Sequence, residues 1–156
     1  MVHAGRYGPD AEDPRLSPLF LGYPGAVRGY NISSFTAAEC PTNPNAGCPV
    51  FDRLVGSRIL VGNAEARFPL FGVLGLGGGY YGAFPIEAVL FADAGLAWTE
   101  SDQPSLFQVR RQAVASAGAA LRMNLFGFAV AELNYVKPFM RPDKGWYWQL
   151  SLTPGF

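Results

Sequence analysis

The sequence predicts an all-β fold, an antiparallel sheet that forms part of a transmembrane β-barrel. Apolar and polar residues alternate along five segments, so that each segment has one apolar and one polar face. The connections between these segments alternate between short and long, which is typical of barrels that cross an outer membrane. Aromatic residues gather at the ends of the apolar faces, as they do in the girdles of such barrels.

The composition indicates a surface that faces something other than water. Charged residues make up 15% of the 156 residues, compared with about 25% in soluble domains, and aromatic residues reach 14%. The formal net charge is zero, which gives no electrostatic case for nucleic acid as a partner. No apolar run approaches the ~18 residues of a membrane helix, and the first ten residues lack the regions of a signal peptide. We therefore expect any export signal to lie upstream of Met1.

A long connection comes before most of the strands. After the end of one strand in "VHAGRYG", residues 9–56 are polar and rich in Pro and Gly, and we expect them to form a long extracellular loop. Cys40 and Cys48 lie in this loop, close enough across a turn-rich stretch to suit a local disulfide in an oxidising compartment. Two free cytosolic thiols are the alternative. A metal site would need further ligands, and His3 is the sole histidine.

The last five strands are expected within residues 57–156. Their polar faces carry sparse charges and many small residues, whereas a soluble β-sandwich would place Lys and Glu on its outer face. Strands of ~9–11 residues with lipid on one side and a polar lumen on the other fit this pattern better. The alternating segments are 59–70, 85–98, 116–126, 129–136 and 146–156. The apolar face of the last segment includes Trp146, Trp148, Leu150, Leu152 and Phe156.

The connections place the two ends of the strands on opposite sides of the membrane. "NLFGFA" at 124–129 predicts a tight periplasmic turn, whereas the connections at 99–111 and 137–145 are long and predict extracellular loops. Within the second of these, "RPDKG" has the residues of a simple turn. By the same rule the long loop of residues 9–56 lies on the extracellular side.

One connection departs from that rule. Residues 71–84 should form a short turn, yet they are long and contain a G-x-G-x-x-G pattern at Gly77, Gly79 and Gly82. Nucleotide binding by this pattern requires a helix to follow, but Pro85 and another alternating segment come next. We therefore expect a glycine-rich extension of a hairpin and no cofactor.

Arg28 is a lone cation in the stretch "GYPGAVRGYN". An arginine in a long loop can simply be solvated. However, Glu65 and Asp93 both lie on the polar, inward faces of neighbouring strands. If the loop folds back into the lumen, the Arg28 guanidinium can meet both carboxylates, where charge-assisted hydrogen bonds are strong and unpaired charges are costly. Gly29 would let the backbone turn at the loop tip.

Four motifs of this sequence resemble motifs that occur in the same order in one protein family. "VRGY", "NAEARFPLF", "FADAG" and the terminal "LSLTPGF" are similar to the C-terminal half of the bacterial surface antigen barrel, the BamA and TamA outer-membrane assembly family. The resemblance implies a loop that enters the lumen and is held there by its arginine. It also implies a last strand that carries an aromatic-ended targeting signal, here Trp146 to Phe156. The implied loop-to-barrel lock consists of Val27, Arg28, Gly29, Tyr30, Glu65, Asp93 and Gly95.

The resemblance also implies that these residues are part of a larger barrel. The family barrel has sixteen strands preceded by periplasmic domains, while this chain supplies the end of one strand and about five more. Fewer than eight strands cannot close a barrel alone, and an open edge would leave backbone groups unsatisfied in lipid. We therefore expect a fragment of a longer protein in preference to several copies that close one barrel.

The function implied by the resemblance is insertion, assembly or translocation of polypeptides at the bacterial outer membrane. The expected partners are the lipid bilayer, lipopolysaccharide, the remaining strands of the barrel and client outer-membrane polypeptides. We expect no catalytic residue, no metal and no cofactor, since the residues include no G-x-S-x-G nucleophile motif. An outer-membrane anchor of a hydrolase and a passive pore are the alternatives.

Overall fold

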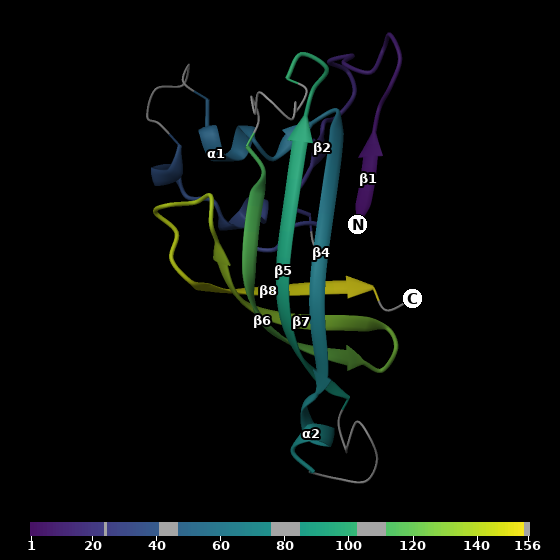
Figure 1. Ribbon diagram of the computed structural model, residues 1–156, viewed down its shortest axis with the longest axis vertical. Helices are drawn as coiled ribbons and strands as arrows, with labels where there is room; N and C mark the ends of the chain where they lie inside the picture. Colours follow the sequence, from purple (N-terminus) through teal and green to yellow (C-terminus); the bar gives the residue numbers. More distant parts are fainter. Residues whose placement is uncertain (24, 41–46, 76–84, 103–111, 155–156) are drawn as a thin grey trace.

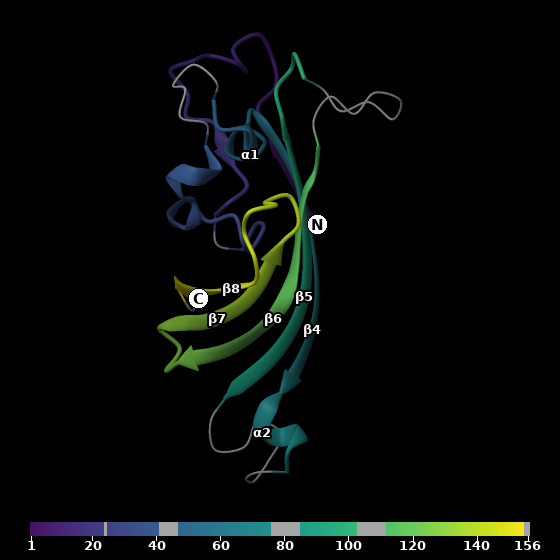
Figure 2. The ribbon, with the colours of Figure 1, turned by 90° about the vertical axis from the view of Figure 1, so that its left-hand side faces the viewer.

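The computed structural model describes residues 1–23, 25–40, 47–75, 85–102 and 112–154. Six strands form one antiparallel sheet, and their order in the sheet follows their order in the sequence. Figure 2 shows that the sheet is strongly curved, like a section of a barrel wall. The strands are β1 (Val2–Gly5), β4 (Arg58–Pro69), β5 (Ile86–Trp98), β6 (Val114–Leu125), β7 (Ala129–Pro138) and β8 (Tyr147–Pro154). The all-β prediction is confirmed, and each predicted segment overlaps one strand.

The long loop lies on the concave side of this sheet (Figures 1 and 2). It contains a small two-stranded sheet made of β2 (Leu19–Phe20) and β3 (Val55–Gly56). The described residues between these strands include three short helical turns: η1 (Ile32–Ser34), η2 (Ala37–Glu39) and α1 (Pro49–Asp52). Among the described residues, none of the helices is long and apolar enough to cross a membrane.

The two faces of the sheet differ as the alternation predicts. On the convex face large apolar side chains are exposed, for example Leu90 at 58% and Trp148 at 63%. On the concave face Val61, Ala97 and Val114 are buried under the loop. They form one apolar cluster with the loop residues Phe20, Leu21, Val27, Tyr30 and Leu54. An apolar outer surface and a covered inner surface are what a barrel wall in lipid requires.

The register of the strands sets the inner face. Asn63 pairs with Asp93, and Asp93 in turn pairs with Ser116. Further toward the C-terminus, Arg122 pairs with Glu132. Cross-strand partners lie side by side on the same face. The polar residues of successive strands therefore meet in one area of the concave surface.

The predicted tight turn joins β6 to β7. Phe126 and Gly127 have φ angles of 54° and 81°, and Phe128 N donates to Leu125 O over 3.0 Å. Two positive φ angles at the central positions of this turn match the twist of a hairpin. The Phe126 side chain is 94% exposed, so the turn projects an aromatic ring away from the sheet.

The connection after β4 differs from the prediction at its start. The alternating segment was expected to reach Leu70, but the strand ends at Pro69 and the short helix α2 (Leu70–Val73) begins. Proline lacks the N–H that a continuing ladder needs, which explains the end of the strand. The glycine pattern at Gly77, Gly79 and Gly82 lies outside the described residues, and so does Phe156.

Candidate functional site: the loop tip on the concave face

The tip of the long loop, Val27 to Tyr30, is buried against the concave face of the sheet. Val27 is 1% exposed, Arg28 7% and Tyr30 0%. A cation buried to this extent is costly unless it is paired and hydrogen-bonded. The partners of Arg28 therefore decide whether this loop position is stable.

Asp93 on β5 is the main partner of Arg28. Arg28 Nε donates to Asp93 Oδ2 over 2.7 Å, and Arg28 Nη2 donates to Asp93 Oδ1 over 2.8 Å. The backbone N–H of Arg28 also donates to Asp93 Oδ2, over 3.2 Å. The Asp93 side chain has no exposed surface, and Asn63 Nδ2 donates to its Oδ1 over 2.9 Å. This is the bidentate, charge-assisted geometry in which arginine binds carboxylates most strongly.

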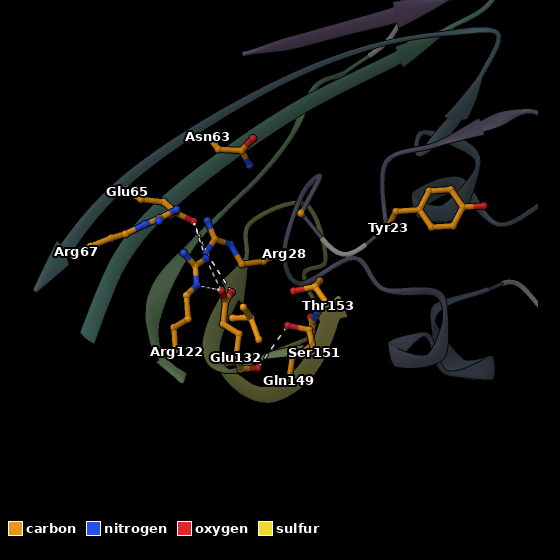
Figure 3. Close-up of a pocket in the computed structure, with 12 residues that line it drawn as sticks. Tyr23, Arg28, Asn63, Glu65, Arg67, Arg122, Glu132, Gln149, Ser151 and Thr153 are labelled. Carbon is orange, nitrogen blue, oxygen red and sulfur yellow. Dashed lines mark hydrogen bonds and ion pairs between the residues drawn. The ribbon is translucent and has the colours of Figure 1, made fainter. Parts of the chain in front are cut away.

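Two further carboxylates complete the surroundings of the guanidinium. Arg28 Nη1 lies 2.9 Å from Glu65 Oε1 and 3.4 Å from Glu132 Oε1. Glu132 also accepts from Arg122 Nε over 2.7 Å, and Arg67 Nη2 lies 2.5 Å from Glu65 Oε2. Figure 3 shows these side chains converging from several strands and from the loop on one cavity. The cavity has a volume of about 600 Å³. With Asp93, three arginines meet three carboxylates, so the charges in this cluster balance.

An aromatic ring supports the arginine from the wall side. Arg28 Cζ lies 3.7 Å from the centroid of the Phe91 ring, a cation–π distance. The Phe91 ring in turn lies over Gly118, where an added Cβ would come within 2.8 Å of the ring. Glycine at position 118 therefore leaves the space in which the ring supports the guanidinium.

Gly95 makes room for Val27. A Cβ at position 95 would lie 2.6 Å from Val27 Cγ2 and 3.1 Å from Leu21 Cδ2. Carbon atoms in contact normally lie about 3.5–4.0 Å apart. The glycine of "FADAG" is thus required by the close approach of the loop, two residues from the aspartate that binds the arginine.

Gly29 and Tyr30 are held by backbone and hydroxyl contacts. Gly29 has a φ of +88°, a conformation that favours glycine, and its N–H donates to Gln149 Oε1 on β8 over 3.0 Å. The Tyr30 hydroxyl donates to Ala115 O over 3.0 Å and accepts from Met140 N over 3.1 Å. Burial raises the pKa of Tyr30 above its ordinary value, so the hydroxyl keeps the proton that it donates.

The remaining predicted residues lie away from this cluster. Cys40 and Cys48 are joined by a disulfide. Trp146, Trp148, Leu150 and Leu152 are all more than half exposed on the convex face. Tyr135 stacks on Trp146 with ring centroids 5.1 Å apart. In the described ranges, no group of three or more His, Cys, Asp or Glu is arranged to hold a metal ion.

The alternation places several further contributors on the polar face without indicating a role for them. Glu132 and Arg122 are the clearest cases, and their direct cross-strand pairing in the β6–β7 hairpin is a signal that could have linked them. Phe91 lies in the motif that contains Asp93, and its parity places it inward. Gln149 on β8 could not be linked to Gly29, because 120 residues separate the two in the sequence.

The fold and the site together define a section of an outer-membrane β-barrel wall with a loop docked on its inner face. A family model described as the Omp85 superfamily domain matches residues 11–153. The chain therefore belongs to the Omp85 superfamily, and its place is the bacterial outer membrane. The predicted resemblance to the surface antigen barrel is confirmed at the family level. No curated protein and no solved structure matched the chain.

Proposed function

We propose that this chain is the C-terminal part of a barrel whose complete form inserts or translocates polypeptides at the outer membrane. In this proposal residues 57–156 are the last five strands and residues 9–56 are the extracellular loop that enters the lumen. Family membership supports the general function. The buried bidentate pair of Arg28 and Asp93 is the observation that carries the proposal for the loop.

The Arg28 cluster acts as a structural lock in this proposal and performs no covalent chemistry. Breaking a buried ion pair by removing one partner destabilises a protein by about 3–5 kcal/mol. Because 1–2 kcal/mol already changes an equilibrium about 5- to 30-fold, a cost of this size shifts the tip strongly toward the undocked state. The lock keeps the loop inside the barrel and keeps the lumen side of the wall ordered.

The strand that would meet a client is β8. It pairs with β7 on one side, and its other edge has no partner among the described residues. An edge strand offers a row of backbone donors and acceptors to an incoming strand. We propose that β8 is one lip of a seam at which client strands pair, and that its terminal aromatic residues form the targeting signal.

The outer face of the same hairpin suits the lipid interface. Tyr135 stacks on Trp146 and lies 4.8 Å, centroid to centroid, from Trp148. All three are exposed at the end of the hairpin that is extracellular in this proposal. Amphipathic aromatic rings favour the level of the lipid headgroups. We propose lipid and lipopolysaccharide as the partners of this surface.

The test compares Arg28→Ala with the parent in the natural full-length protein, reconstituted in lipid vesicles. We expect faster proteolysis within residues 30–56 and slower insertion of an unfolded barrel client into the vesicles. Arg15→Ala is the matched control, since its side chain is 87% exposed in the same loop. Equal protection and equal insertion in Arg28→Ala and the parent would refute the lock. Ion conductance without client insertion would favour a passive pore, and hydrolysis by the full-length protein would favour an enzyme anchor.

A further inference from the structure

A second arginine binds the long loop from the opposite direction. Arg141 lies in the connection between β7 and β8, a stretch that the sequence predicts to be a simple turn. It is 1% exposed and is one of the largest fully buried side chains. A buried guanidinium has to be fully paired to be tolerated, so a solvated turn residue does not describe it.

All of the Arg141 donors are used. Nε and Nη2 donate to the two carboxylate oxygens of Glu39 over 2.7 Å each. Nη1 donates to Ser34 Oγ and Nη2 to Ser34 O, over 2.8 and 2.9 Å. The fifth bond runs from Nη1 to Gly29 O over 2.8 Å. An arginine has five N–H donors, and here each has an acceptor. The Phe35 ring lies 4.0 Å from Cζ.

The Glu39 carboxylate is itself held in place. The Thr36 N–H donates to Glu39 Oε2 over 2.9 Å in a capping box at η2. Glu39 also directly precedes Cys40, which is joined to Cys48 by a disulfide. The side chain of Glu39 is only 6% exposed. Arg141 therefore meets an acceptor that contacts within the loop also hold in place.

The bond to Gly29 links Arg141 to the tip. Gly29 follows Arg28 directly, and its N–H is bound by Gln149 on β8 while its carbonyl is bound by Arg141. Both polar backbone groups of Gly29 are thus held by the hairpin of β7 and β8. Fixing these two groups fixes the backbone from which the Arg28 side chain extends toward Asp93.

We propose that Arg141 is a positioning residue for the loop tip: it holds the Gly29 carbonyl so that Arg28 meets Asp93. This inference deepens the lock proposed above and rests on it. Arg28 reaches from the loop to the wall, and Arg141 reaches from the wall connection to the loop. Glu39 and Ser34 orient the Arg141 guanidinium for this contact.

The peptide bond between Arg28 and Gly29 provides a direct readout of the tip. Trypsin cuts after arginine, but in the docked loop this arginine is buried. We would expose the natural full-length protein in lipid vesicles to trypsin and follow the fragment that begins at Gly29 by mass spectrometry. The bond between Arg141 and Pro142 does not interfere, because trypsin cleaves poorly before proline.

We expect Arg141→Gln to increase cleavage after Arg28 by at least about tenfold, since cleavage follows the population of the open form. Glu39→Gln removes the carboxylate partner of the buried Arg141 charge, so we expect an increase of similar size, and Arg141→Lys, which keeps an ion pair with Glu39 but lacks the guanidinium fork that also reaches Gly29 O, separates the two roles. Arg15→Gln, which removes an exposed ion pair of the same loop, is the matched control and should change nothing. If Arg141→Gln folds in low yield, Arg141→Lys keeps the charge and should still raise cleavage after Arg28.

Each alternative result has its own meaning. Cleavage at the parent rate in Arg141→Lys would overturn the positioning role, because Arg141 would then act only as an ion pair between two loops. An increase in Asp93→Asn but none in either Arg141 variant would also overturn it and leave the lock intact. No increase in Asp93→Asn would instead refute the lock on which the inference rests.

Discussion

Replacing Gly95 with alanine tests how closely the loop has to approach the wall. The new Cβ would lie 2.6 Å from Val27 Cγ2, about 1 Å closer than carbon atoms in normal contact. Val27 is 1% exposed and is packed in the apolar cluster under the loop, so it cannot turn away into solvent. Overpacking of this kind costs about 1–3 kcal/mol.

A change of this size is visible as loop opening. One to three kcal/mol corresponds to roughly a 5- to 150-fold change in an equilibrium. We therefore expect Gly95→Ala to raise trypsin cleavage after Arg28 in the full-length protein by about that factor. Gly62→Ala in the neighbouring strand β4 is the matched control, because a Cβ at position 62 meets nothing within 4 Å.

A second substitution separates this clash from a general weakening of the strand. Val27→Ala removes the methyl group that the new Cβ would strike, although it also leaves a cavity of its own. In the double variant the alanine methyl at position 95 occupies part of that cavity. We expect the two effects to be non-additive by about 1–2 kcal/mol, as is usual for residues in contact. Additive effects, or equal opening in Gly62→Ala, would refute the reasoning.

Three more predictions follow from the described contacts. Asp93→Asn should destabilise the folded barrel more than Glu132→Gln does, by about 3 against about 1 kcal/mol, because the Asp93 side chain is fully buried and its bonds to Arg28 are shorter. The temperature at which the barrel unfolds on a gel should fall in the same order, and equal shifts would contradict this ranking. The hydrogen bonds from its arginine partner lower the pKa of Glu39 from 4.5 to about 2, so its stabilisation is fully present above pH 4.5 and is lost as the pH falls toward 2. The parent should therefore lose more thermal stability than Glu39→Gln between pH 6 and pH 3, and parallel curves would argue against it. Alkylation of Cys40 and Cys48 should occur only after reduction, and labelling without a reductant would speak against the disulfide in the natural protein.

The strands were predictable because a barrel wall in lipid needs apolar residues on its outer face and polar residues on its inner face. Alternation with a period of two places each residue on one face, and this was enough to put Glu65 and Asp93 on the inner side of neighbouring strands. The motif around Arg28 then identified the cation that contacts both of these carboxylates in the structure. Local signals also gave the tight turn at Phe126 and Gly127, where the loop length sets the backbone conformation.

The rest depends on contacts between residues far apart in the chain. Glu132 reaches Arg28 only because the sheet curves until β7 approaches the docked loop, and no local pattern encodes that curvature. The role of Arg141 could not be predicted, because it lies in a stretch of turn residues. Such residues indicate that the chain turns there, but they do not indicate what an arginine in the turn binds. Its partner Glu39 is 102 residues away.

The contact between Gln149 and Gly29 gives the strand β8 two roles at once. One face of this strand holds the loop tip, and its edge is where an incoming strand is proposed to pair. Thermodynamic linkage makes such an arrangement reciprocal. If pairing at the edge lowers the affinity of β8 for the loop tip by some factor, then release of the tip must raise the affinity of the edge for an incoming strand by the same factor. The client strand and the loop tip would then be two ligands of β8. The affinity of β8 for either one could be measured from its effect on the binding of the other.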